Sequence, residues 1–458
     1  MDSQTRHMSD RRHILEHAPM YLGDTELRRD WVLGLYTEEQ LAAVPEDRKR
    51  VSPGFEAIRK AFGFGPAMVR TPMTELLLQT LREIVNNALD RIVTDEACNS
   101  VTCRLNNGAI MVQNNGQGFP LTFVSVEGQE KHTIEAALFS ARTSSNFGRG
   151  AAGGGGGGGS AGGSVPSSQE ADGASSGAGD SEVVATSRSI TGGMYGVGAT
   201  LTAVWSNLFR VTSQSLDTDG SVVTQETGCE DNMEKVHPYT SKRRRLDAGK
   251  KPKDRSHLRT AVMWEPDWKR MGFASNPVSD SPAARGVLCR ILCELFTGRS
   301  ASLPAERRLQ CRFDGVTWKG RTVQDWAWVT MGIRSKPKGC LHAGLPFAIP
   351  TRPRWLTTFV TVHPSDEELV REDGPTVPWR ESPPQFGLVN AISCSQGTIR
   401  THVESLVKDA IHQSASASSS AGGCSLDDAR RAAWIGYVAT VPNPQFSSQT
   451  KDRLLTPV

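Results

Sequence analysis

The segment from residue 83 to residue 120 constrains the fold of this chain more than any other stretch. Over residues 74–91 the apolar side chains recur at every third or fourth position, which predicts an amphipathic helix. Glu83, Asn87 and Asp90 fall at i, i+4 and i+7 of that helix, so they form one polar stripe about two turns long. The stripe borders the apolar face, and its carboxylates are therefore expected to be partly buried. A surface helix with an acidic edge is the alternative interpretation.

Two strand-like runs, at 101–105 and 109–112, follow the helix and are joined by Asn106-Asn107-Gly108, a typical hairpin turn. The next residues read Asn114-Asn115-Gly116-Gln117-Gly118-Phe119-Pro120. Glycines allow a ligand to approach the backbone closely, and an asparagine side chain donates and accepts hydrogen bonds at once. These residues therefore indicate a ligand-binding turn.

Together, the helix and the turn resemble the first two nucleotide-binding boxes of the GHKL ATPases. Within that superfamily they are most similar to the type IIA DNA topoisomerases, whose second box in eukaryotes reads N-N-G-K-G-I-P. Four further similar stretches follow in the order of the family. They are T-S-S-N at 143–146, a lid glycine box at 192–200, V-N-A-I at 389–392 with Gly397, and N-P-Q-F-S-S-Q-T-K at 443–451. The resemblance runs from His13 to Lys451, nearly the whole chain.

The resemblance implies an α+β architecture, in which a GHKL (Bergerat) ATPase α/β sandwich is followed by a transducer domain of ribosomal-protein-like α/β fold. We expect an N-terminal arm at 1–50, the ATPase domain at 51–270 and the transducer at 271–458. Residues 13–23 are similar to the arm that crosses to the other subunit in this family, which implies a homodimer formed by ATP-induced closure of an N-terminal gate. The DNA-cleaving domains of the family are expected to be absent from these 458 residues.

The resemblance also implies roles in the attack of water on the γ-phosphate of ATP. Glu83 would orient and deprotonate the water, and Asn87 would hold a Mg²⁺ ion that bridges the phosphates. Lys451 would contact the γ-phosphate from the second domain. Asp90 would support the pocket, and Asn114 takes the place of the aspartate that reads adenine in many relatives.

The other residues expected to bind the nucleotide come from the glycine turn, the T-S-S-N stretch, the lid box and the last loop. They are Gly116, Gly118, Ser144, Ser145, Asn146, Gly193, Met194, Tyr195, Gly196, Val197, Gly198, Ala199, Thr200, Gln449 and Thr450. The lid box departs from the eukaryotic G-R-N-G-Y-G-A-K and is similar to the gyrase version, G-L-H-G-V-G-A-S. Its glycines precede an apolar helix start at 201–208, so backbone N–H groups and the positive helix end can converge on the triphosphate. Residues 148–189 are nearly all Gly, Ser and Ala and are expected to form a disordered insertion in the lid.

Further patterns predict the remaining elements. In the first domain, 134–141 predicts a buried helix or strand, and 209–213, 221–224 and 260–264 predict strands of its sheet. In the second domain, 287–296 predicts a buried helix, and 309–313, 359–362 and 434–441 predict strands. Cys289 and Cys293 lie at helical spacing among apolar residues, which favours reduced core thiols over a zinc site.

Charge and hydropathy limit the possible partners and location. Lys+Arg 52 against Asp+Glu 49 leaves a net charge of +3, too near balance to indicate a nucleic-acid or membrane surface by itself. The basic runs at 241–245 and 250–253 are consistent with a solvated loop, a nuclear import signal or a phosphate-contacting patch. No apolar run approaches the roughly 20 residues that a membrane span needs, so we expect a soluble intracellular protein without a membrane partner. The resemblance favours the nucleus, with the mitochondrion as the alternative.

The sequence therefore predicts the ATPase gate portion of a type II DNA topoisomerase. Such a protein binds and hydrolyses ATP with Mg²⁺, dimerises and drives DNA strand passage. One alternative is a nucleotide-dependent dimerisation module with little turnover. Another is a GHKL ATPase of the mismatch-repair or chaperone branches, against which the Q-T-K loop argues.

Overall fold

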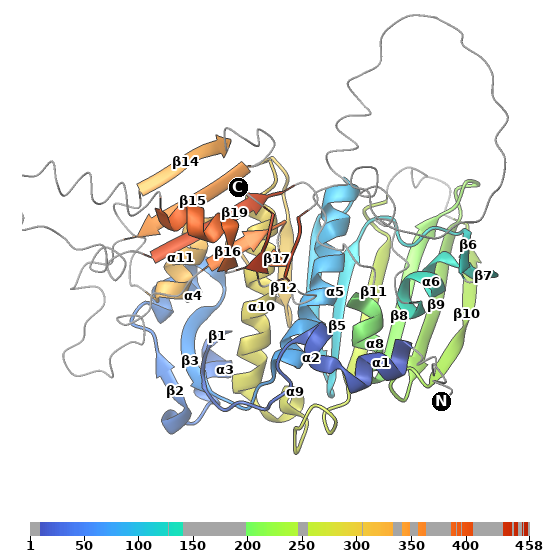
Figure 1. The fold of residues 1–458 in the computed structure, drawn as a ribbon, viewed down its shortest axis with the longest axis horizontal. Helices are drawn as coiled ribbons and strands as arrows, with labels where there is room; N and C mark the ends of the chain where they lie inside the picture. Colours follow the sequence, from blue (N-terminus) through green and yellow to red (C-terminus); the bar gives the residue numbers. More distant parts are fainter. Residues whose placement is uncertain are drawn as a thin grey trace, which may run out of the picture.

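A central eight-stranded sheet organises the chain in this computed structural model (Figure 1). The structure describes residues 10–126, 128–140, 198–245, 255–304, 306–332, 341–348, 356–362, 386–390, 392–394, 396–405, 434–441, 444–447, 451 and 453–456. The strand order is β10-β9-β8-β11-β5-β4-β12-β13, and only the β12–β4 pair is parallel. The strands are β4 (Ser100–Asn106), β5 (Ala109–Asn115), β8 (Ser206–Leu216), β9 (Val222–Glu230), β10 (Lys235–Arg244), β11 (Arg259–Pro266), β12 (Gln310–Phe313) and β13 (Val316–Trp318).

The β4–β5 hairpin confirms the predicted turn. Asn106 pairs with Ala109, and the two residues between them have positive φ, 46° at Asn107 and 89° at Gly108. A two-residue turn of this kind needs positive φ at both positions, which asparagine and glycine tolerate best. The turn fixes the register of β5 and so the place where β5 delivers Asn114.

Two long helices, α5 (Glu75–Thr94) and α10 (Pro282–Ala301), lie side by side next to the sheet (Figure 1). Thr74 caps α5 by accepting a hydrogen bond from Leu76 N at 3.3 Å. Most of α5 is buried, including Glu83 and Asn86. This confirms the helix predicted at 74–91 and the burial of its acidic edge at Glu83. Shorter helices flank it: α1 (Asp10–Glu16), α2 (Ala18–Leu22), α6 (Thr133–Phe139), α8 (Gly198–Val204) and α9 (Pro277–Asp280).

A three-stranded antiparallel sheet supports the other side of α10. Its order is β1-β3-β2, with β1 (Trp31–Tyr36), β2 (Lys49–Val51) and β3 (Gly65–Arg70). The connections carry α3 (Glu38–Ala42), the 3₁₀ helix η1 (Glu46–Arg48) and α4 (Phe55–Phe62). Tyr36 joins β1 to α10, because its hydroxyl donates to Ala283 O at 2.8 Å. Much of the segment predicted as an arm is thus built into the fold.

The C-terminal part forms a five-stranded sheet of order β14-β15-β19-β16-β17. Its strands are β14 (Leu341–Ala348), β15 (Leu356–Val362), β19 (Trp434–Thr440), β16 (Phe386–Val389) and β17 (Ile392–Ser393). Helix α11 (Val323–Met331) packs against β15 and β19. Two small sheets complete the described fold: β6 (Phe123–Val126) with β7 (Gln129–His132), and β18 (Gln396–Gly397) with β20 (Arg453–Leu454).

Three expectations need correction. The strand expected at 309–313 in the second domain is β12, which pairs with β4 of the central sheet. The helix expected over 201–208 ends at Val204, and β8 begins at Ser206. In the basic run at 241–245, residues 241–244 lie on the exposed strand β10 and not in a loop, and Arg245 follows the strand. The domain boundary between 270 and 271 stays a prediction, and the central sheet continues past it to Trp318.

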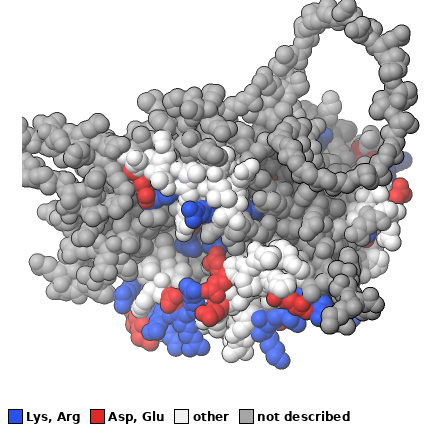
Figure 2. All heavy atoms as spheres, viewed as in Figure 1, with Lys and Arg blue, Asp and Glu red and all other residues white. Residues whose placement is uncertain are grey.

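One apolar core runs through both halves of the chain, from Ile14 to Val438. Cys289 and Cys293 lie in it as free thiols with their Sγ atoms 3.9 Å apart, and burial raises the pKa of both. Among the described helices, none combines the length and apolarity that crossing a membrane requires. On the face drawn in Figure 2, Lys and Arg side chains are interspersed with Asp and Glu side chains.

Candidate active site

Glu83 forms the centre of the candidate site. It is only 4% exposed, and its Oε1 atom accepts a hydrogen bond from Gln79 Nε2 at 3.0 Å. Lys451 Nζ lies 3.3 Å from the same oxygen, although 368 positions separate the two residues in the chain. Lys451 is also buried and has a positive φ of 58°. A buried carboxylate needs such a partner, because an unpaired charge in the interior is costly.

The lid box reaches Glu83 through its last residues. Gly198 is the first residue of α8, and a Cβ atom at this position would overlap the Glu83 carboxylate. Only glycine therefore lets the helix begin against that group. Thr202 Oγ1 donates to the backbone of α5 at 3.3 Å and fixes α8 there. The hydroxyl of Thr200 donates to Leu138 O at 2.9 Å, so this side chain joins α8 to α6.

Asn87 is exposed, one turn after Glu83 in α5, and its side chain makes no hydrogen bond to the described residues. Its amide oxygen is a hard donor of the type that Mg²⁺ accepts. The described residues contain no group of three or more His, Cys, Asp or Glu side chains suited to a metal ion. Mg²⁺ commonly keeps waters and takes few protein ligands beside phosphate oxygens. A single exposed amide beside a buried carboxylate fits that mode.

Asp90 turns toward α10 and not toward Glu83. Its Oδ1 atom lies 2.6 Å from Nη2 of Arg299, a side chain that is 1% exposed. Asp90 was predicted to support the site, and its ion pair with Arg299 is a contact through which it can do so. Arg299 was not predicted from the sequence, because an ion pair between residues so distant in the chain leaves no local pattern.

Asn114 and Asn115 end strand β5, and both are buried. The Asn114 Nδ2 atom donates to Asn115 O at 2.9 Å and lies 3.8 Å from Cys98 Sγ. Burial raises the pKa of the Cys98 thiol to about 11, so this thiol is neutral at physiological pH. Asn115 has a structural role, since its Oδ1 accepts from the backbone N–H groups of Asn99 and Ser100 at 2.9 and 2.8 Å.

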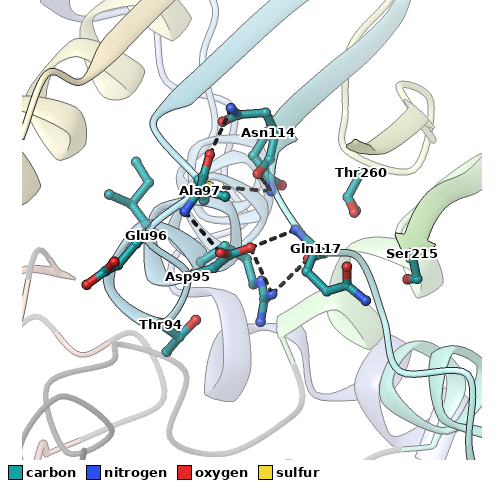
Figure 3. Close-up of polar contacts among 12 residues, drawn as sticks. Thr94, Asp95, Glu96, Ala97, Asn114, Gln117, Ser215 and Thr260 are labelled. Carbon is teal, nitrogen blue, oxygen red and sulfur yellow. Dashed lines mark hydrogen bonds and ion pairs between the residues drawn. The ribbon is translucent and has the colours of Figure 1, made fainter. Parts of the chain in front are cut away.

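Asp95, which follows α5, holds the glycine turn in place (Figure 3). Its Oδ2 atom accepts from Gln117 N at 2.6 Å, and its Oδ1 atom accepts from Ala97 N at 3.1 Å. Arg91 donates to Gln117 O at 2.7 Å and lies 3.8 Å from Asp95. Asp95 was not predicted from the sequence. Its position just after a helix, where aspartate often binds free backbone N–H groups, was the available signal.

The glycines of the turn have a packing role that the sequence did not predict, and their predicted contact with a ligand stays a prediction. A Cβ atom on Gly116, where φ is +100°, would lie 2.7 Å from Asp95 Oδ2. A Cβ atom on Gly118 would lie 2.6 Å from Gln214 O and closer still to Ser213. Both glycines are therefore required by packing against the protein itself.

We expect Gly116→Ala to lower the free energy of unfolding by about 3 kcal/mol, because strain at positive φ and overpacking add. Gly128→Ala is the matched control, since Gly128 has a φ of +80° and nothing within 4 Å of an added Cβ. The control should lose only about 1 kcal/mol, from strain alone. Chemical denaturation measures both values, and equal losses would contradict the packing role of Gly116.

Many residues assigned to the nucleotide lie outside the described residues. They are Ser144, Ser145, Asn146, Gly193, Met194, Tyr195, Gly196, Val197, Gln449 and Thr450, together with the insertion at 148–189. Their roles stay predictions. Ala199 is described and is half-buried in α8.

The fold was compared with solved structures. The ATPase region of Saccharomyces cerevisiae topoisomerase II matches with a TM-score of 0.64 at 18% identity, over 100% of this chain and 91% of that one. The same region bound to ICRF-187 (dexrazoxane) matches with a TM-score of 0.62 at 19% identity, over 99% and 91%. The chain has the fold of the topoisomerase II ATPase region.

A third topoisomerase II structure extends this result. The ATPase and transducer domains of the Balamuthia mandrillaris enzyme match with a TM-score of 0.59 at 18% identity, over 100% of this chain and 90% of that one. No protein-family model and no curated protein matches the sequence. The architecture implied by the motifs, a GHKL ATPase followed by a transducer, is thus confirmed at the level of the fold.

Proposed function

We propose that this chain is the ATPase gate portion of a type II DNA topoisomerase, which binds and hydrolyses ATP with Mg²⁺ and dimerises around it. The observation that carries the proposal is the contact between Glu83 and Lys451. Two residues whose motifs assign them to water activation and to the γ-phosphate, at opposite ends of the chain, meet in one buried site. The topoisomerase II fold supports the same proposal.

The residues of the site suggest how the reaction proceeds. Glu83 accepts the proton of the attacking water, and Gln79 holds its carboxylate in place. Lys451 neutralises charge that develops on the γ-phosphoryl oxygens. Mg²⁺, held by Asn87, would neutralise charge on the phosphates. The beginning of α8 at Gly198 excludes water from one side of Glu83.

The direct test is ATP hydrolysis by the purified chain, measured as phosphate release with Mg²⁺ and with excess EDTA. We expect slow, Mg²⁺-dependent turnover. Failure to bind ATP by calorimetry would overturn the proposal.

Asn87→Ala should weaken the binding of Mg²⁺-ATP by at least about tenfold, because the amide oxygen proposed to hold the metal is lost. Asn207→Ala is the control, since Asn207 is also exposed but lies at the start of β8. Calorimetric titration with and without Mg²⁺ measures the effect. Unchanged Mg²⁺-dependent affinity would rule Asn87 out as the ligand.

A second candidate function is a nucleotide-dependent dimerisation module with little turnover. The Lys451–Glu83 ion pair favours it, because a base held by a buried cation is less available to a water. Binding and dimerisation without phosphate release would select this alternative.

The proposed partner is DNA and the proposed location is the nucleus. Strand β10 supports both, since Lys242, Arg243 and Arg244 are exposed on it. A fluorescent fusion with these three residues changed to alanine would test the import role. Unchanged nuclear accumulation would remove β10 as the signal.

A further inference from the structure

Arg299 occupies the place where α5, α10 and the C-terminal sheet meet. Its side chain is 1% exposed, and within the described residues its Nη2 atom makes the two hydrogen bonds of the guanidinium. One, at 2.6 Å, goes to Asp90 Oδ1 on α5. The other, at 3.0 Å, goes to the backbone oxygen of Asn390, which follows β16. A single guanidinium thus bridges the helix of the candidate active site and the C-terminal sheet.

Asn390 is in turn hydrogen-bonded to strand β19 and to Val441, the residue after it. Its backbone N–H donates to Ala439 O at 2.9 Å. Its side chain pairs with Val441 in both directions, since Nδ2 donates to Val441 O and Oδ1 accepts from Val441 N, each at 2.9 Å. Asn390 has a φ of 52°, a left-handed conformation that asparagine tolerates better than most residues. The end of β19 is therefore fastened to the residue that Arg299 holds.

Val441 begins the segment that leads to Lys451. The contacts of this segment form a closed series that begins and ends at Val441. From Val441 the chain runs to Lys451, which contacts Glu83, and α5 connects Glu83 to Asp90. Asp90 is hydrogen-bonded to Arg299, Arg299 to Asn390, and Asn390 to Val441. The segment is thus linked to α5 directly at Lys451 and through Asn390 and Arg299 at Val441. Between these points, Gln445 and Ser447 are hydrogen-bonded to residues 453–456.

The bridge is energetically expensive. Within the part of the chain that the structure describes, the buried Nε and Nη1 atoms of Arg299 have no hydrogen-bond partner. Burial lowers the pKa of Arg299, and Asp90 opposes that shift. An apolar side chain of similar volume commonly stabilises a core as well as or better than a buried ion pair. Stability alone therefore does not explain why a charged residue occupies this position. The two hydrogen bonds of Arg299, to Asp90 and to Asn390, do explain it.

We propose that Arg299 is a positioning residue that sets Lys451 relative to Glu83 and thereby lets the site distinguish a triphosphate from a diphosphate. The inference rests on the proposed ATP-binding function. In the described part of the chain, Arg299 is hydrogen-bonded to neither Glu83 nor Lys451, and it acts on them through Asp90 and Asn390. Losing the bridge removes a link between α5 and the C-terminal sheet, to which the Lys451 segment is fastened through Asn390. The contact to the γ-phosphate should weaken, while contacts to the rest of the nucleotide remain.

The test uses the double variant Asp90→Leu with Arg299→Met, which removes both charges of this ion pair together. Calorimetry with Mg²⁺ measures the affinity for ADP and for a non-hydrolysable ATP analogue. We expect the ratio of the two affinities to fall roughly tenfold, within the usual range of coupling between sites. Any contact that Asp90 makes to the common part of the nucleotides would change both affinities and cancel in the ratio.

The matched control is Arg290→Met with Glu294→Leu, which removes another ion pair of α10, 2.6 Å long and largely buried. Glu294 also accepts from Ser393 of β17 at 3.3 Å, so the control too removes a contact between α10 and the C-terminal sheet. This control variant keeps the hydrogen bond between Arg299 and Asn390. Its ratio of ATP-analogue affinity to ADP affinity should therefore equal that of the parent.

A second variant, Asn390→Gly, keeps the left-handed backbone and the carbonyl but loses the side-chain pairing with Val441. It should lower the ratio in the same way, and it protects the test if the double variant does not fold. Parental ratios in the folded variants would overturn the inference. A parent that binds neither nucleotide would instead overturn the proposed function.

Discussion

Replacing Glu83 by glutamine is expected to slow ATP hydrolysis by about a hundredfold or more, with little change in ATP affinity. The amide keeps the size of the side chain and can still accept from Gln79, but it cannot take a proton from water. Phosphate release in single-turnover experiments measures the chemical step, and calorimetry measures binding.

The control for this experiment is Glu96→Gln, an exposed carboxylate just beyond the end of α5. It should hydrolyse ATP at the parental rate. If Glu83→Gln also turned over like the parent, Glu83 would not be the general base. A loss of binding equal to the loss of rate would instead give Glu83 a role in the ground state.

Lys451→Met is expected to abolish dimerisation driven by a non-hydrolysable ATP analogue. In the parent, the analogue should convert monomer to dimer and ADP should do little, because a ligand shifts a conformational equilibrium only by its differential affinity for the two states. Lys451 supplies that difference if it senses the γ-phosphate. Methionine keeps the length of the side chain but carries no charge.

Size-exclusion chromatography with light scattering distinguishes the two states. Lys319→Met is the control, since Lys319 is exposed and lies beyond β13, outside the proposed site. A dimer that forms without the analogue, or that survives Lys451→Met, would contradict the gate mechanism. Because Glu83 loses its buried cation in this variant, a thermal melt should accompany the measurement.

Local patterns in the sequence predicted the elements that carry the site. The spacing of apolar residues over 74–91 predicted α5, and Asn107-Gly108 predicted the hairpin that ends at Asn114. The family motifs predicted that Glu83 and Lys451 share a site, and they do. No periodicity could have joined residues so far apart, so this part depended on the resemblance.

Tertiary pairing accounts for most of what the sequence could not predict. A strand pattern does not specify its partner, and 309–313 was therefore expected in the wrong sheet. A solvated loop was one of three interpretations of the basic residues of β10. Charged side chains are also common on edge strands, where they discourage further pairing. Arg299 lies among apolar residues of α10, and only the fold brings it to Asp90.

The parallel pairing of β12 with β4 has a consequence for the biosynthesis of this protein. Ser100 pairs with Gln310, so one edge of β4 stays open until the ribosome has added the intervening residues. At typical elongation rates that interval lasts roughly ten to forty seconds. During it the edge of β4 is a template for pairing with another chain. Newly made copies on one messenger RNA are therefore most prone to aggregate in this interval, and a chaperone that covers β4 would act then.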